Sequence, residues 1–172
     1  MSTPFVLASC NEFIAHWICL AAPRMVPHTT TFVDNITPLV RDALILELLP
    51  DGTFVRFMGS GLVSRWQQDF TGAHLEQVIA APDQTRFRKH VEAVCHYPAG
   101  LRARDEVRTS SGRKIEYEMV VLPLAVDADK PPRCVVYRGM LAPLDWRESK
   151  KRFCIARFRY LDKSWLGHTG SY

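Results

Sequence analysis

Long apolar runs, paired cysteines and an excess of charge over most of the chain are all missing from this 172-residue sequence. No segment reaches the roughly 18 uninterrupted apolar residues of a membrane-spanning helix. The five cysteines are odd in number, lie far apart and form no C-x-x-C pair, which argues against a disulfide framework or a metal site and favours free thiols in a reducing compartment. The segment LASC at 7–10 resembles the cleavage box of a lipoprotein signal, but no basic residue precedes it and its apolar run is too short. We therefore expect a cytoplasmic protein without a metal site.

Recognisable catalytic motifs are missing as well. The sequence has no G-x-S-x-G elbow, no H-E-x-x-H pair and no cysteine–histidine signature. Glu116 and Glu118 lie two residues apart and could act as paired carboxylates on one face of a strand. Their simpler interpretation is a solvent-exposed strand face, with partners across the hairpin among Arg102, Arg104 and Arg108. The sequence thus gives no support for an enzyme.

The stretch MGSGLVSRWQQDFTG at 58–72 is rich in glycine and invites comparison with a phosphate-binding loop. Gly59 and Gly61 start such a pattern, but Ser64 stands where the third glycine belongs and no lysine follows. We therefore interpret Gly59, Gly61 and Gly72 as turn positions that allow a positive φ or a close approach of the chain.

Charge is balanced over residues 1–144, which hold 15 Lys/Arg and 15 Asp/Glu, whereas residues 145–172 hold 7 and 3. In this C-terminal extension the basic residues are interleaved with aromatic ones, a composition that can hold a nucleic-acid backbone or an acidic protein surface. The excess is small, and an added strand at 153–160 accounts for it about as well. We therefore expect no nucleic-acid binding.

An amphipathic helix is predicted near the N-terminus. Ser9 and Glu12 have the spacing of a capping box, and apolar residues then recur at helical intervals until Pro23 ends them. This helix either covers an apolar surface of its own domain or packs against a second copy of the chain. We expect a homodimer, with candidate interface residues Phe13, Ile14, Trp17 and Ile18.

The remaining length suits one domain of ordinary size. Residues 25–42 are rich in proline and threonine and lack a clear period, which is typical of a linker that ends in a turn or short helix. The predicted organisation is an N-terminal amphipathic helix, a linker, a folded domain and a basic extension, at 1–24, 25–42, 43–144 and 145–172.

Within the folded domain, strands are predicted at both ends and helices between them. ALILELL and TFVRFMG flank Asp51-Gly52, a strong hairpin signal. Two short helices follow, and Pro82 begins a longer helix with one apolar stripe. Three more strands are then predicted from LRARDEVRTS, RKIEYEMVVLPLAV and RCVVYRGMLAPL.

This order of elements resembles the PAS fold, an α+β fold in which a five-stranded antiparallel sheet carries helices on one face and encloses a cavity. ELLPDGTFVRFMGSG is similar to the hairpin that opens PAS domains, and QQDFTGAHLEQVI to their short turn and helix. SGRKIEYEMVVLPL and RCVVYRGML resemble the last two strands. FVRFMGSGLVSRWQQDFTG and the LPL at 122–124 are also similar to short, single-domain bacterial PAS proteins. The resemblance covers residues 43–140.

A PAS-like sheet and its helices would enclose an apolar pocket. Alternation along the strands and the apolar stripe of the long helix point candidate lining residues inward. These candidates are Leu46, Leu48, Val55, Phe57, Trp66, Phe70, Phe87, His90, Val91, Val94, Tyr117 and Met119.

The resemblance also raises two cofactor questions, and the sequence leaves the cofactor unknown. His90 lies on the helix from which haem-binding PAS domains present an axial histidine, although a histidine at the edge of a core face needs no metal. Light-responsive flavin-binding PAS domains carry a reactive cysteine in a segment of Asn-Cys-Arg-Phe-Leu type. The corresponding HLEQVIAAPDQTRF has none and Cys95 comes too late, so we expect no photoadduct.

The sequence is therefore interpreted as a sensory or regulatory PAS module without its own output domain. It would act by binding a small apolar ligand, by associating with a signalling protein, or by both. Two alternatives stay open: a small α+β enzyme with an apolar pocket, and an interaction domain that binds no ligand.

Overall fold

One antiparallel sheet organises the fold. The computed structural model describes residues 7–21, 26–35, 38–96, 99–143, 147, 153–157 and 164–166. The helices of this part are α1 (Ala8–Ala21), α2 (Thr29–Asn35), η1 (Pro38–Asp42), α3 (Ser60–Trp66), η2 (Leu75–Gln77) and α4 (Ala81–His96). Its strands are β1 (Ala43–Leu49), β2 (Gly52–Met58), β3 (Gly100–Thr109), β4 (Lys114–Leu124), β5 (Arg133–Met140), β6 (Phe153–Arg157) and β7 (Ser164–Leu166).

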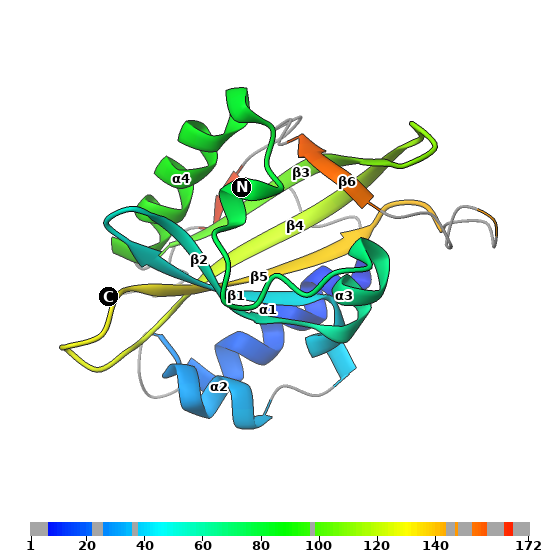
Figure 1. Cartoon of the computed structure of the whole chain (residues 1–172). Helices are drawn as coiled ribbons and strands as arrows, with labels where there is room; N and C mark the ends of the chain where they lie inside the picture. The colour runs from blue at the N-terminus through cyan, green and yellow to red at the C-terminus, as the bar shows by residue number, and fades with distance from the viewer. Residues whose placement is uncertain are drawn as a thin grey trace.

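The strands follow the order β2-β1-β5-β4-β3-β6, and β7 also pairs with β3 (Figure 1). Every neighbouring pair is antiparallel. Strands β1 to β5 form the five-stranded antiparallel sheet of the α+β fold that the sequence predicted. The strand predicted near 153–160 is present as β6, and β7 was not predicted.

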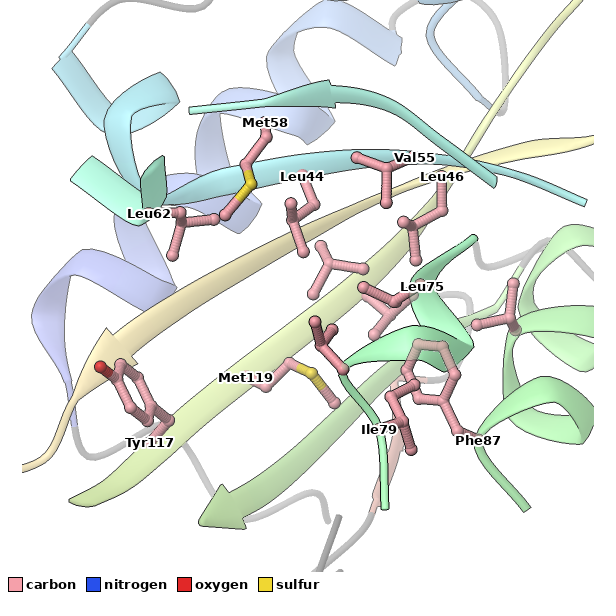
Figure 2. Close-up of a cluster of buried hydrophobic side chains, with 14 of the residues drawn as sticks. Leu44, Leu46, Val55, Met58, Leu62, Leu75, Ile79, Phe87, Tyr117 and Met119 are labelled. Atoms are coloured by element: carbon pink, nitrogen blue, oxygen red, sulfur yellow. The ribbon is translucent and has the colours of Figure 1, made fainter. Parts of the chain in front are cut away.

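One face of the sheet, here called the inner face, packs against α3, η2 and α4 (Figure 1). The helix α4 turns its predicted apolar stripe toward the sheet, with Phe87, Val91 and Val94 buried. From the strands, alternate residues such as Leu46 and Met119 point into the same layer (Figure 2). This layer is the larger hydrophobic core of the chain.

The opposite face, here called the outer face, is covered by α1 and α2 (Figure 1). Phe13 is 0% exposed and stacks on Tyr137 of β5, and its ring also meets Phe32 of α2 edge to face. Trp17 is buried and its indole Nε1 donates to the carbonyl of Pro123 at 2.9 Å. Helix α1 is therefore embedded in its own domain.

This packing corrects the sequence interpretation of the N-terminal part. Phe13 and Trp17, two of the four predicted dimer contacts, pack on the chain's own sheet, because its outer face offers an apolar surface. Only Ile14 and Ile18 of that set keep exposed surface. The predicted linker at 25–42 contains α2 and η1, and the Thr29 N–H donates to the carbonyl of Ala125 at 2.9 Å.

A β-bulge in the first hairpin corrects a second prediction. Leu46 pairs with Val55 and Ile45 pairs with Phe57, so Arg56 is the extra residue. An extra residue reverses the alternation on one side of the bulge. Val55 therefore faces the inner core as predicted, whereas Phe57 packs on the outer layer and not in the predicted pocket.

The glycines of the 58–72 stretch are turn positions, as predicted. A Cβ on Gly59 would overlap the carbonyl oxygen of Val40, and one on Gly61 would lie 2.8 Å from an Asp42 carboxylate oxygen. Gly72 has a φ of +87°, a conformation that glycine adopts without strain.

The C-terminal extension joins the fold through β6 and β7. Phe153, the first residue of β6, is buried in the inner core, where its ring meets the rings of Trp66 and Tyr117 edge to face. Most of the basic residues of this extension lie outside the described residues. Among the described helices, none is long and apolar enough to cross a membrane.

Candidate ligand-binding site

An apolar pocket lies between the inner face of the sheet and the helices that cover it. Twelve of its lining residues are apolar or aromatic, and the thirteenth is Arg138. The sheet contributes Leu44, Val55, Met58, Met119, Val136 and Arg138, and the covering segments contribute Leu62, Trp66, Phe70, Leu75, Val78, Ile79 and Phe87.

The pocket is nearly filled by its own side chains. Its cavity volume is about 20 Å³, which is room for about one water molecule. Figure 2 shows Met58 and Met119 among the side chains that fill the interior, with Tyr117 at one end. Methionine is the side chain that changes shape most readily in a core, so a larger ligand would displace these two first.

Five of the twelve predicted lining residues do line the cavity: Val55, Trp66, Phe70, Phe87 and Met119. Another four are buried in the same core without reaching the cavity: Leu46, Val91, Val94 and Tyr117. Leu48 is partly buried beside that core, His90 is half-buried outside the lining, and Phe57 is on the outer layer.

Sequence reasoning missed the one charged residue of the lining, Arg138, and its partner Asp105. Both follow strand alternation: Arg138 shares its parity with Cys134 and Val136 on β5, and Asp105 shares its parity with Ala103 on β3. The signal was therefore present in the sequence. It was passed over because charged residues are usually placed on the solvent face.

The Arg138 guanidinium forms a buried ion pair with the Asp105 carboxylate. Asp105 is 0% exposed and Arg138 is 5% exposed. Burial raises the pKa of Asp105, and the Arg138 charge and hydrogen bond offset only part of that rise. Arg138 is thus the one charged side chain in an otherwise apolar wall, and Asp105 balances its charge.

Tyr117 lies against this pair. The guanidinium carbon of Arg138 is 4.5 Å from the centroid of the Tyr117 ring, a cation–π contact. Burial raises the pKa of Tyr117 to about 12, and the positive charges of Arg138 and Arg65 oppose that rise. Arg65 of α3 in turn forms an ion pair with Asp42.

We call these five residues the polar cluster: Asp42, Arg65, Asp105, Tyr117 and Arg138. Four of its buried polar atoms have no hydrogen-bond partner in the part of the chain that the structure describes, namely Arg65 Nε, Asp105 Oδ1, Tyr117 Oη and Arg138 Nε. Buried polar atoms without partners are costly, so a group of them at the edge of a pocket is a candidate recognition point.

A second buried ion pair lies on the outer face. Arg102 Nη2 donates to Glu118 Oε1 at 2.9 Å, and the Leu7 N–H donates to Glu118 Oε2 at 2.8 Å. Glu118 is 0% exposed, which contradicts its predicted solvent-facing position, because α1 folds back over this part of β4. The predicted arginine partner is present, and Glu116 is exposed as predicted.

No arrangement in the described part of the chain gathers three or more histidine, cysteine, aspartate or glutamate side chains as metal ligands.

The architecture and the position of this pocket define a class of protein. The sequence matches the family model described as "PAS domain" over residues 6–142, a range that includes α1. The chain belongs to the PAS-domain family, whose members are generally sensory modules.

Two solved structures are similar to the chain at low sequence identity. The LOV protein of Rhodobacter sphaeroides is 10% identical, with 62% of each chain covered and a TM-score of 0.46. A fungal LOV domain photoreceptor is 14% identical, with 78% of this chain and 94% of that chain covered and a TM-score of 0.48. The chain thus spans less than two thirds of the Rhodobacter sphaeroides protein. No curated protein matches the sequence.

Proposed function

We propose that this chain is a sensory PAS module that binds a small, largely apolar molecule in the inner pocket. The signal then leaves through the outer face of the sheet, where α1 and α2 lie.

The observation that carries this proposal is the alternation along β4 and β5. Met119 and Arg138 face the pocket, while their neighbours Val120 and Tyr137 pack beneath the outer helices. A ligand that displaces Met119 or Arg138 moves the same backbone that supports α1. Because Phe13 stacks directly on Tyr137, a shift of β5 changes the surface on which α1 packs.

Binding is tested first with the purified full chain. Native mass spectrometry should show a retained small molecule, and octan-1-ol should raise the melting temperature. Leu62→Trp fills the cavity and should abolish the octan-1-ol effect, whereas Thr85→Trp, at an exposed position on α4, should keep it. A wild-type protein with neither an adduct nor a thermal shift would rule out ligand binding.

Output is tested by hydrogen exchange. Octan-1-ol should change the exchange rates of the amides in α1 in the wild type and leave them unchanged in Leu62→Trp. Equal exchange rates with and without octan-1-ol in the wild type would mean that binding in the pocket does not affect α1, and would refute the proposed output.

We also propose that the chain forms a homodimer through the exposed side of its outer helices, where it could meet a signalling partner as well. Ile18 is 53% exposed and Val33 is 45% exposed. They are the only large apolar side chains so exposed among the described residues, and both lie on the helices of the outer face. Ile18→Lys should shift sedimentation toward the monomer, and a wild type that sediments as a monomer at micromolar concentration would refute the dimer.

A further inference from the structure

We propose that the molecule recognised by the pocket is an aliphatic monocarboxylic acid whose carboxylate is received by Arg138, Tyr117 and Arg65. This inference rests on the proposed ligand-binding function and adds the chemical class of the ligand.

Buried donors outnumber buried acceptors among the unpartnered atoms of the polar cluster. Among the described residues, Arg138 Nε, Arg65 Nε and Tyr117 Oη are buried donors without a partner, while Asp105 Oδ1 is the one buried acceptor of the cluster that lacks one. A group left in this state costs free energy, so three such donors favour a ligand that brings acceptors. A carboxylate is an acceptor with two oxygens and about four lone-pair sites, enough for all three donors.

Arg138 lines the cavity, Tyr117 lies against it just outside the lining, and Arg65 is near enough for its charge to act on Tyr117. The Arg138 guanidinium lies over the Tyr117 ring at 4.5 Å, and the Arg65 and Arg138 charges both act on the Tyr117 hydroxyl. Each arginine is held by a carboxylate of the protein, Asp42 for Arg65 and Asp105 for Arg138. Each is therefore fixed in place and still has its Nε free to donate.

The lining of the pocket determines what the rest of the ligand can be. Apart from Arg138, the pocket offers only apolar and aromatic side chains, so the body of the ligand must be apolar. The small cavity and its two methionines favour a narrow, flexible alkyl chain that threads between side chains over a rigid ring system. A rigid, planar cofactor would require a much larger preformed space.

The experiment compares octanoate with octan-1-ol, which has the same chain length and no charge. Isothermal titration of the wild type should give octanoate at least tenfold the affinity of octan-1-ol. Tyr117→Phe removes one donor and should lower the octanoate affinity about threefold while leaving octan-1-ol unchanged. Arg56→Met, which removes an exposed arginine away from the pocket, should change neither affinity.

Removal of Arg138 tests the main contact. Arg138→Met alone leaves Asp105 buried without its partner, so the double variant Arg138→Met with Asp105→Leu serves as the folded form of this test. It should bind octanoate no better than octan-1-ol. Equal affinities in the wild type, or a preference for octanoate that survives the double variant, would overturn the carboxylate inference. If the wild type binds octan-1-ol in the same titrations, the proposed ligand-binding function still holds. If it binds neither octan-1-ol nor octanoate, both the ligand-binding function and the carboxylate inference are overturned.

Discussion

The ring of Phe13 stacks on the ring of Tyr137 with their centroids 4.7 Å apart and their planes 19° from parallel. The next residue along β5, Arg138, lies in the wall of the pocket on the opposite face of the sheet. Strand β5 therefore connects the surface on which α1 packs to the polar cluster, the candidate recognition point.

Phe13→Ala should lower the free energy of unfolding by about 3–5 kcal/mol, because it removes a fully buried ring and leaves a cavity under α1. Urea denaturation followed by tryptophan fluorescence measures the change. Cys19→Ala, on the exposed side of the same helix, should stay within about 0.5 kcal/mol of the wild type. Equal effects of the two substitutions would mean that α1 is not docked as described.

Tyr117→Phe should leave the unliganded protein as stable as the wild type, or more stable by up to about 1 kcal/mol. The substitution keeps the ring under Arg138 and removes a buried hydroxyl that has no partner. Thermal or urea unfolding without ligand gives the answer. A clear loss of stability would show that this hydroxyl is hydrogen bonded in the protein.

The free energy of unfolding of Asp105→Asn should increase, relative to that of the wild type, as the pH rises. Burial raises the folded pKa of Asp105 above its ordinary value of 3.8, so the folded state binds the proton more tightly than the unfolded state. The stability that this group contributes is present in full below pH 3.8 and is lost as the pH rises through the folded pKa. Asparagine does not titrate, so its free energy of unfolding lacks this dependence.

The measurement is urea unfolding of both proteins at several pH values upward from 4. A difference between Asp105→Asn and the wild type that does not change with pH would contradict the raised pKa. Asp69→Asn is a suitable comparison when the series is extended below pH 4. The backbone N–H of Thr71 lowers the pKa of that exposed carboxyl from 3.8, so the stability it contributes is lost as the pH falls, and the slope there is opposite.

Cysteine labelling should report the docking of α1. Cys10 is fully buried and burial raises its pKa to about 12, whereas Cys19 on the same helix is exposed. Because the thiolate is the reactive form, iodoacetamide at pH 8 should modify Cys19 well before Cys10. Peptide mass spectrometry resolves the two sites. Phe13→Ala should speed the labelling of Cys10 specifically, and comparable rates for both cysteines in the wild type would argue against a docked helix.

Much of the fold was predictable because local signals agreed with one another. The strand at Ala43–Leu49 was predicted to the residue, since a continuous apolar run ends at an Asp-Gly turn. The helix beginning near Pro82 was predicted from its apolar stripe, which α4 turns to the sheet. Signals of this kind are contained in short segments and need no knowledge of the rest of the chain.

The failures come from contacts between distant parts of the chain. Glu118 looks solvent-facing by alternation and is buried only because a helix more than 100 residues earlier returns to cover it. Phe57 faces the outer layer because a bulge opposite Ile45 and Leu46 shifts the register, and no residue type marks that bulge. Asp105 obeys alternation, but its place in the core depends on a partner from another strand, Arg138.

Phe153 belongs to the C-terminal extension, outside residues 6–142 that match the family model, yet its ring meets Trp66 in the pocket wall. A protein cut back to the family range would keep every strand from β1 to β5 and still lose the aromatic backing of that wall. Under the proposed function, the extension would therefore help to set ligand preference, and changes in that segment offer a way to alter selectivity without redesigning the sheet.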